Sequence, residues 1–188
     1  MIPACSRWWP GCARLLSVAG LVFLLVLTPI GLGQMEDAGR QDLFRTATAE
    51  AVLKITAKDF QLKDLNGSLV RLSDFRGKRA VLLYFWATWC PGCISIKPAV
   101  AKLRSDVSEE RMEILAVNVG APDSLERVMH YQKGHPSPYP VLYDGAGQVT
   151  TAYQVLGIPL FILVDKDGSV VYRSNMLPGN IEKYLGNQ

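Results

Sequence analysis

The chain has 188 residues, of which 49% are hydrophobic and 20% are charged, and its formal net charge is +3. Removing Arg7 and Arg14, which belong to an apolar leader, lowers that charge to +1. This balance gives no basic footprint for a nucleic acid, and the remaining length suits one domain with a single core.

The start of the chain predicts a membrane-targeting segment. Residues 1–34 contain Arg7 and Arg14, no acidic residue, and an almost unbroken apolar run over 15–33. A charged start followed by an apolar core is typical of a signal peptide or a membrane anchor. The run nearly reaches the roughly 20 residues that span a bilayer, which favours an anchor, whereas small residues before Gln34 suit cleavage. Because the positive charges precede the run, we expect the rest of the chain on the extracytoplasmic (periplasmic) side, anchored or secreted.

The folded domain is expected to follow a polar segment. Residues 35–53 are polar and mixed in charge, so they predict a linker, and the domain is expected over 54–188. Asn66-Gly67 is a strong two-residue hairpin signal between two apolar stretches. We therefore expect an N-terminal β-hairpin with 69–72 as its return strand.

A buried βαβ unit is predicted next. The apolar runs 80–85 and 112–119 are typical of strands covered on both faces. Between them, apolar residues recur at helical spacing over 93–107. The two strands are therefore expected to be parallel and connected by a helix.

The remainder of the chain predicts short elements. In order they are a helix at 123–133, a strand at 139–143, a helix at 148–155, a hairpin of strands 160–164 and 169–172, and a final helix at 180–185. Together with the βαβ unit, these elements predict an α/β domain whose central mixed sheet is flanked by helices.

The sequence W-C-P-G-C, residues 89–93, lies where the first central strand meets its helix. Two cysteines with two residues between them can close a disulfide at such a turn. At a helix start, unpaired backbone N–H groups and the helix dipole favour a thiolate on Cys90, and Pro91 has no N–H to leave unpaired. We predict Cys90 as the nucleophile and Cys93, one turn further in, as the resolving thiol.

Other uses of the cysteine pair fit less well. A zinc site needs about four ligands, but Cys5 and Cys12 lie in the leader. Haem attachment needs a histidine after the second cysteine, and Ile94 stands there. A peroxiredoxin-type peroxidase would carry threonine or serine three residues before its reactive cysteine, and Ala87 precedes Cys90 at that distance. A purely structural disulfide would constrain so short a loop little.

Four segments of the domain form a recognisable set. They are D-F-Q-L-K-D-L-N-G at 59–67, L-S-D-F-R-G-K at 72–78, F-W-A-T-W-C-P-G-C at 85–93 and G-I-P-L-F-I-L-V-D-K-D-G at 157–168. With these segments the chain resembles the TlpA/ResA-type membrane-anchored thiol-disulfide oxidoreductases of the thioredoxin superfamily. The resemblance implies a thioredoxin-like fold for the domain and a redox-active disulfide.

The resemblance also implies a substrate-binding surface. It implies that the Ile158-Pro159 peptide is cis and lies beside the dithiol, where the backbone of Ile158 pairs with a partner protein, and that Trp89 packs over the site. The expected substrate contacts are Trp89, Pro91, Gly92, Ile158 and Pro159, with no cofactor beyond the dithiol. The implied partners are protein thiols and disulfides, such as apocytochrome c or other envelope proteins, and a membrane electron donor such as a DsbD/CcdA-type protein.

Two positions depart from the relatives that the chain resembles. Tyr84 stands where thioredoxins carry a buried aspartate, and Ile96 stands where ResA-like members carry a glutamate. Cys93 must then lose its proton by another route, through water or Lys97, although a lysine on a helix is more often solvated. We expect a working but slower exchanger, or one matched to a particular partner.

A binding function and a second enzymatic function compete with dithiol exchange. Thioredoxin-like copper chaperones space their cysteines by three residues and add a histidine. Here the spacing is two, and His130 and His135 fall at a predicted helix end and loop. A metal assembly chaperone and a thiol peroxidase are therefore the alternatives to a thiol-disulfide oxidoreductase.

Overall fold

The computed structural model describes residues 54–186. The predicted leader, 1–34, and the predicted linker, 35–53, lie outside the described residues. Within 54–186, no helix is long and apolar enough to cross a membrane.

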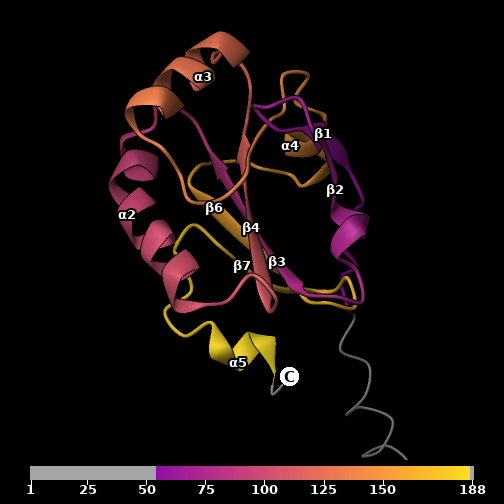
Figure 1. Ribbon diagram of the computed structural model, residues 1–188. Coiled ribbons are helices and arrows are strands. Elements are labelled where there is room, and N and C mark those ends of the chain that lie inside the picture. Colours follow the sequence, from indigo (N-terminus) through magenta and orange to yellow (C-terminus); the bar gives the residue numbers. More distant parts are fainter. Residues whose placement is uncertain (1–53, 187–188) are drawn as a thin grey trace, which may run out of the picture. The chain divides into compact units, whose positions relative to one another are not determined.

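A five-stranded mixed sheet forms the centre of the domain (Figure 1). Its spatial order is β5 (Val141–Tyr143), β4 (Met112–Asn118), β3 (Ala80–Trp86), β6 (Leu160–Val164) and β7 (Val170–Ser174). β3 pairs parallel with β4, and β4 pairs parallel with β5. β6 pairs antiparallel with both β3 and β7. The predicted parallel unit and closing hairpin are confirmed, and they join along β3 and β6.

Helices cover both faces of this sheet. They are the 3-10 helix η1 (Leu72–Phe75) and the α-helices α2 (Pro91–Asp106), α3 (Leu125–Gly134), α4 (Gln148–Ala152) and α5 (Glu182–Leu185). Because successive strand residues point to opposite faces, Leu82 and Tyr84 of β3 pack with residues of α2, α3 and α5. Leu83 and Phe85 pack with residues of η1 and α4 on the other face. All four β3 side chains are buried, which explains the unbroken apolar run of this strand.

The predicted N-terminal hairpin is present as a small separate sheet of β1 (Gln61–Lys63) and β2 (Leu69–Arg71). In its turn, Gly67 has a φ of +85°, and the Asp64 carboxylate accepts hydrogen bonds from the backbone N–H groups of Asn66 and Ser68. An isolated bridge between Asp64 and Leu142 connects the hairpin to β5.

The described part of the chain begins against the hairpin of β6 and β7. Ala57 donates a backbone hydrogen bond to Gly168, Val170 donates one to Ile55, and Thr56 bridges Ser169. This hairpin turn follows the end of β6 that pairs with the start of β3. The domain therefore begins at the opposite end of β3 from the dithiol segment.

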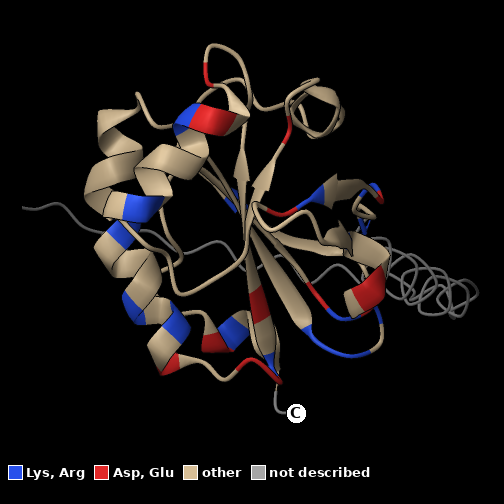
Figure 2. Cartoon of the chain, turned by 45° about the horizontal axis from the view of Figure 1, so that its top comes forward, with Lys and Arg blue, Asp and Glu red and all other residues tan. Residues whose placement is uncertain are grey.

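Charged residues of both signs are distributed over the helices and loops of the domain (Figure 2). The strands β3 and β6 carry none. This distribution agrees with the absence of a nucleic-acid footprint in the sequence.

Candidate redox site

The two cysteines lie at the junction of β3 and α2. β3 ends at Trp86 and α2 begins at Pro91, so the turn between them carries Cys90 to the helix start. Cys90 and Cys93 form a disulfide with an S–S distance of 2.14 Å and a Cα–Cα distance of 5.2 Å. The predicted pairing at the carboxyl end of a central strand is confirmed.

The two sulfur atoms occupy different environments. Cys90 is the N-cap residue of α2, with extended backbone angles, and its Sγ accepts a hydrogen bond of 3.1 Å from the backbone N–H of Cys93. Pro91 occupies the first turn, where no N–H is missed. Cys93 has no exposed surface, whereas Cys90 is 5% exposed. In the reduced state, the helix start would therefore stabilise a thiolate on Cys90 more than on Cys93.

The loop before β6 lies directly over the disulfide. The Ile158-Pro159 peptide is cis, as the resemblance implies. The Ile158 carbonyl oxygen is 3.8 Å from Cys90 Sγ, and a Cβ added to Gly92 would lie 3.5 Å from Pro159 Cδ. Asn175, which sequence analysis did not identify, holds this loop through an Nδ2 hydrogen bond of 2.6 Å to the Pro159 carbonyl.

The residues expected to contact substrate surround the disulfide. Pro91 and Gly92 are exposed at the helix start, and Ile158 and Pro159 are partly buried in the facing loop. Trp89 is 50% exposed, which is a large apolar surface next to a reactive sulfur. The structure thus brings these residues together at one end of the sheet.

Tyr84 and Ile96 stand at the two positions where the resemblance implies a carboxylate, and neither side chain can act as a base. The Tyr84 hydroxyl is buried and donates a hydrogen bond of 2.8 Å to the Cys93 carbonyl, while its ring stacks on Phe161. Burial raises the pKa of Tyr84 far above its usual value, so the hydroxyl stays protonated. Ile96 packs against the hydrophobic core. Within 54–186, neither cysteine makes a hydrogen bond to a carboxylate.

Lys97 is not the solvated helix residue that the sequence favours. Its Nζ lies 5.1 Å from the Trp86 ring centroid and 4.7 Å from that of Tyr131, and it donates a hydrogen bond of 3.2 Å to the His135 carbonyl. Burial lowers the pKa of Lys97 to about 8. The spacing of four residues places Lys97 on the same face of α2 as Cys93, but its contacts with Trp86 and Tyr131 have no signal in the sequence.

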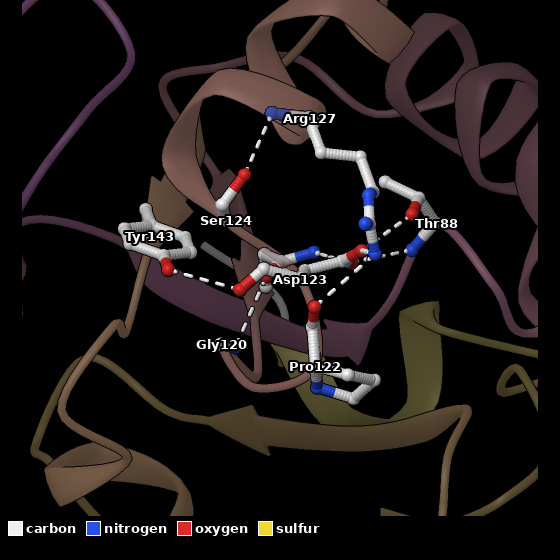
Figure 3. A network of polar contacts seen from close by, with 8 residues as sticks. Thr88, Gly120, Pro122, Asp123, Ser124, Arg127 and Tyr143 are labelled. Atoms are coloured by element: carbon white, nitrogen blue, oxygen red, sulfur yellow. Dashed lines mark hydrogen bonds and ion pairs between the residues drawn. The ribbon is translucent and has the colours of Figure 1, made fainter.

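A buried carboxylate that sequence analysis also missed anchors the turn before Cys90 (Figure 3). Asp123 accepts hydrogen bonds from the Thr88 backbone N–H at 2.8 Å, the Thr88 hydroxyl at 2.5 Å and Asn118 Nδ2 at 2.8 Å. Arg127 Nη1 lies 3.9 Å from the carboxylate, and the Tyr143 hydroxyl donates to the Asp123 carbonyl. The network ties the turn after β3 to the loop after β4.

Among residues 54–186, no group of three or more His, Cys, Asp and Glu side chains is arranged to hold a metal ion. His130 lies within α3, and His135 is its C-cap residue.

Comparison with known proteins assigns the family. The model of the AhpC/TSA family matches residues 54–173. The thiol-disulfide oxidoreductase ResA of Geobacillus kaustophilus is 40% identical over 147 residues, which cover 77% of this chain and 82% of the relative. The chain belongs to the ResA-type thiol-disulfide oxidoreductases of the AhpC/TSA family. A second ResA-type relative, from Geobacillus thermodenitrificans, is 35% identical over 88% of this chain and 91% of its own length.

Solved structures agree with this ResA-type assignment. The thioredoxin domain of a thiol-disulfide oxidoreductase from Bacteroides vulgatus is 27% identical, with a TM-score of 0.61 over 70% of this chain and 96% of that one. MTB dsbF, solved in mixed oxidised and reduced forms, is also 27% identical, with a TM-score of 0.55 over 63% of this chain and 86% of that one. The thioredoxin-like fold and the thiol-disulfide oxidoreductase activity of the family follow.

Proposed function

We propose that this enzyme reduces disulfides of proteins on the extracytoplasmic side of the membrane, with Cys90 as the nucleophile and Cys93 as the resolving thiol. The observation that carries the proposal is the position of Cys90. It caps α2, its Sγ accepts the Cys93 N–H, and the loop of Ile158 and Pro159 lies directly beside it. No cofactor beyond the cysteine pair is needed for this chemistry.

The reaction proceeds through two exchanges. The Cys90 thiolate attacks one sulfur of a substrate disulfide, so a bond forms between Cys90 and that sulfur while the other substrate sulfur leaves as a thiolate. Cys93 then loses its proton and attacks Cys90 Sγ, which releases the second substrate thiol and closes the Cys90-Cys93 disulfide. Two electrons have passed from the enzyme to the substrate, and a thiol donor must return them.

The surface around the disulfide supports a protein substrate. Trp89 offers an exposed apolar ring. Pro91 and Gly92 are exposed and have small side chains or none, so they do not shield Cys90 from a partner. Ile158 lies just before β6, at a place where an extended segment of the partner can pair with its backbone. We propose these residues, with Pro159, as the substrate contacts.

The location and the partners are proposed from the sequence pattern. The charged and apolar leader supports a site in the periplasm, either anchored or secreted, with 35–53 as a linker. Relatives named ResA support an oxidoreductase that acts on protein thiols. We propose envelope proteins as substrates, apocytochrome c among them, and a DsbD/CcdA-type membrane protein as the electron donor.

Two measurements on the full chain test the proposal. The cysteine pair is equilibrated with glutathione, and a reduction potential below about −200 mV is expected for a reductant, whereas a value near about −120 mV would indicate an oxidant and contradict the proposed direction. The variant Cys93→Ser, which cannot resolve the mixed disulfide, is expected to trap substrate proteins on Cys90. Cys90→Ser is the matched control and should trap none.

The same variants separate the alternatives. A copper chaperone would bind metal in a Cys90-dependent titration, and a peroxidase would consume hydrogen peroxide rapidly. Ala87 is buried and carries no hydroxyl to bind a peroxide, which disfavours the second alternative. Rapid peroxide consumption without disulfide reduction would refute the proposed function.

A further inference from the structure

Cys93 is a buried thiol whose deprotonation has no obvious acceptor. It must become a thiolate before it can attack Cys90, yet Tyr84 stays protonated and Ile96 is apolar. A buried thiol without a base gives up its proton slowly, because its charged form is disfavoured away from water. Because positions 84 and 96 carry no carboxylate, the resolving step needs another proton acceptor.

We propose that Lys97 accepts the proton of Cys93 through bound water during the resolving step, an inference that rests on the proposed function. Lys97 follows Cys93 by four residues in α2, so both side chains lie on the same helix face. Long side chains in a helix lean toward its N-terminus, which directs Lys97 back toward the turn of Cys93. Trp86, one of the two rings beneath Lys97 Nζ, packs in the same core cluster as Cys93.

Two buried polar atoms on the rings beside Lys97 have no hydrogen-bond partner among the described residues. Trp86 Nε1 and the Tyr131 hydroxyl are buried and make no hydrogen bond, although both rings contact Lys97 Nζ. Buried polar groups without partners are uncommon, and ordered water is their usual partner. Lys97 also lines an open groove of about 250 Å³ together with Tyr131, His135 and Tyr139, so its ammonium group borders solvent.

The charged and titratable surroundings leave Lys97 able to exchange protons near neutral pH. Tyr131 and His135 face it from α3 and its C-cap, Tyr139 lies on the following loop, and within 54–186 no salt bridge joins Lys97 to a carboxylate. Burial raises the pKa of Tyr139 to about 12, so its hydroxyl does not compete as a base. Burial lowers the pKa of Lys97 to about 8, and a base whose pKa lies near the working pH serves proton transfer well.

The resolving step moves one proton and exchanges one disulfide bond. The neutral amine of Lys97 takes the Cys93 proton through water, the Cys93 sulfur forms a bond to Cys90 Sγ, and the bond from Cys90 to the substrate sulfur breaks. The substrate leaves as a thiolate, and the Lys97 ammonium returns its proton to solvent. When a donor later reduces the disulfide, the same ammonium protonates the departing Cys93 sulfur.

The test follows two chemical phases in one reaction. The full chain, with Cys5→Ser and Cys12→Ser so that only the pair reacts, is reduced and mixed with one equivalent of 5,5′-dithiobis(2-nitrobenzoate) in a stopped-flow instrument. The first release of thionitrobenzoate reports attack by Cys90, and the second reports resolution by Cys93. Both rates are measured from pH 5.5 to pH 9.5.

We expect Lys97→Met to slow the second phase at pH 7 by at least about tenfold, with the first phase within twofold of wild type. The Lys97 variant should also lose the inflection of the second phase near pH 8. Lys97→Arg keeps a charge over both rings but cannot release a proton, so it should remain slow. Lys102→Met, which changes an exposed lysine of the same helix, is the control and should match wild type.

Three results would be decisive against the inference or its basis. An unchanged second phase in Lys97→Met overturns the role of Lys97, and full recovery in Lys97→Arg shows that charge alone suffices, which also overturns it. Absence of both phases in the wild-type pair refutes the proposed function itself, so the two failures are distinguishable. The circular dichroism spectrum of each variant, compared with that of the wild type, shows whether the variant is folded.

Discussion

The Asp123 network allows a graded prediction of stability. In Asp123→Ala, the Thr88 N–H, the Thr88 hydroxyl and the Asn118 amide lose their acceptor inside a protein interior, because the Asp123 side chain has no exposed surface. Hydrogen bonds to a charged group are each worth about 1.5–3 kcal/mol, and each buried donor left without an acceptor costs about 1–3 kcal/mol. Three donors lose their acceptor, so we expect Asp123→Ala to lower the free energy of unfolding by about 3–5 kcal/mol.

Asp123→Asn should lower the free energy of unfolding much less than Asp123→Ala. Its amide oxygen can take the place of Oδ2 and still accept from the Thr88 N–H and Asn118 Nδ2, while its NH₂ group donates to the Thr88 hydroxyl, which can rotate to accept. Only the charge assistance is lost, so we expect a decrease of about 1–2 kcal/mol. The order Ala worse than Asn follows from the geometry of the three bonds.

Urea unfolding of the oxidised chain, followed by circular dichroism, measures both values as shifts of the midpoint at constant slope. Asp167→Ala changes an exposed aspartate and should shift the free energy by less than about 0.5 kcal/mol. A loss below about 1 kcal/mol in Asp123→Ala, or equal losses in the two Asp123 variants, would show that the network does not hold the turn.

Three further predictions use the same unfolding assay. Tyr84→Phe removes the hydrogen bond to the Cys93 carbonyl and should cost about 1 kcal/mol, without changing dithiol exchange at neutral pH; slowed exchange would assign the hydroxyl a chemical role. Gly120→Ala places a Cβ 2.4 Å from a backbone carbonyl oxygen at a φ of +74°, so it should cost more than about 2 kcal/mol. Gly147→Ala, at a φ of +66° in open space, should cost only about 1 kcal/mol, and equal costs would contradict the clash. The pKa of Lys97 is lowered from 10.5 to about 8 on folding, so between these pH values the unfolded chain binds more protons and stability rises with pH. Lys97→Met should lack this rise. If the free energy of unfolding depends on pH in the same way in both proteins, Lys97 is not its cause.

The sequence predicted the order and type of nearly every element because each has a local signal. The run 160–164 matches β6, and the Asn66-Gly67 turn joins β1 and β2. α3 begins at Leu125 rather than at 123, because the Ser124 side chain caps it through the Arg127 N–H. η1 was missed since one short turn over Leu72–Phe75 shows no helical periodicity.

The site was predictable only where its residues form motifs. The cysteine pair is a short local pattern, and the family resemblance implied a cis Ile158-Pro159 peptide beside it; both agree with the structure. Asp123 reaches Thr88 because Gly120 adopts a left-handed conformation and the following loop folds back on the turn after β3, which no spacing in the sequence reveals. The surroundings of Lys97 likewise depend on how α3 packs beside α2.

The position at which the domain begins bears on how its chemistry can be observed. Ala57 and Ile55 are hydrogen-bonded to the hairpin turn beside the start of β3, whereas Cys90 follows the end of that strand. A strand of this length spans roughly 20 Å. A solid support or a fluorophore attached at Lys54 would therefore lie near the opposite end of β3 from the disulfide. A sensor attached in this way would detect a partner protein that forms a mixed disulfide with Cys90, because the partner would bind at the end of the domain away from the attachment point.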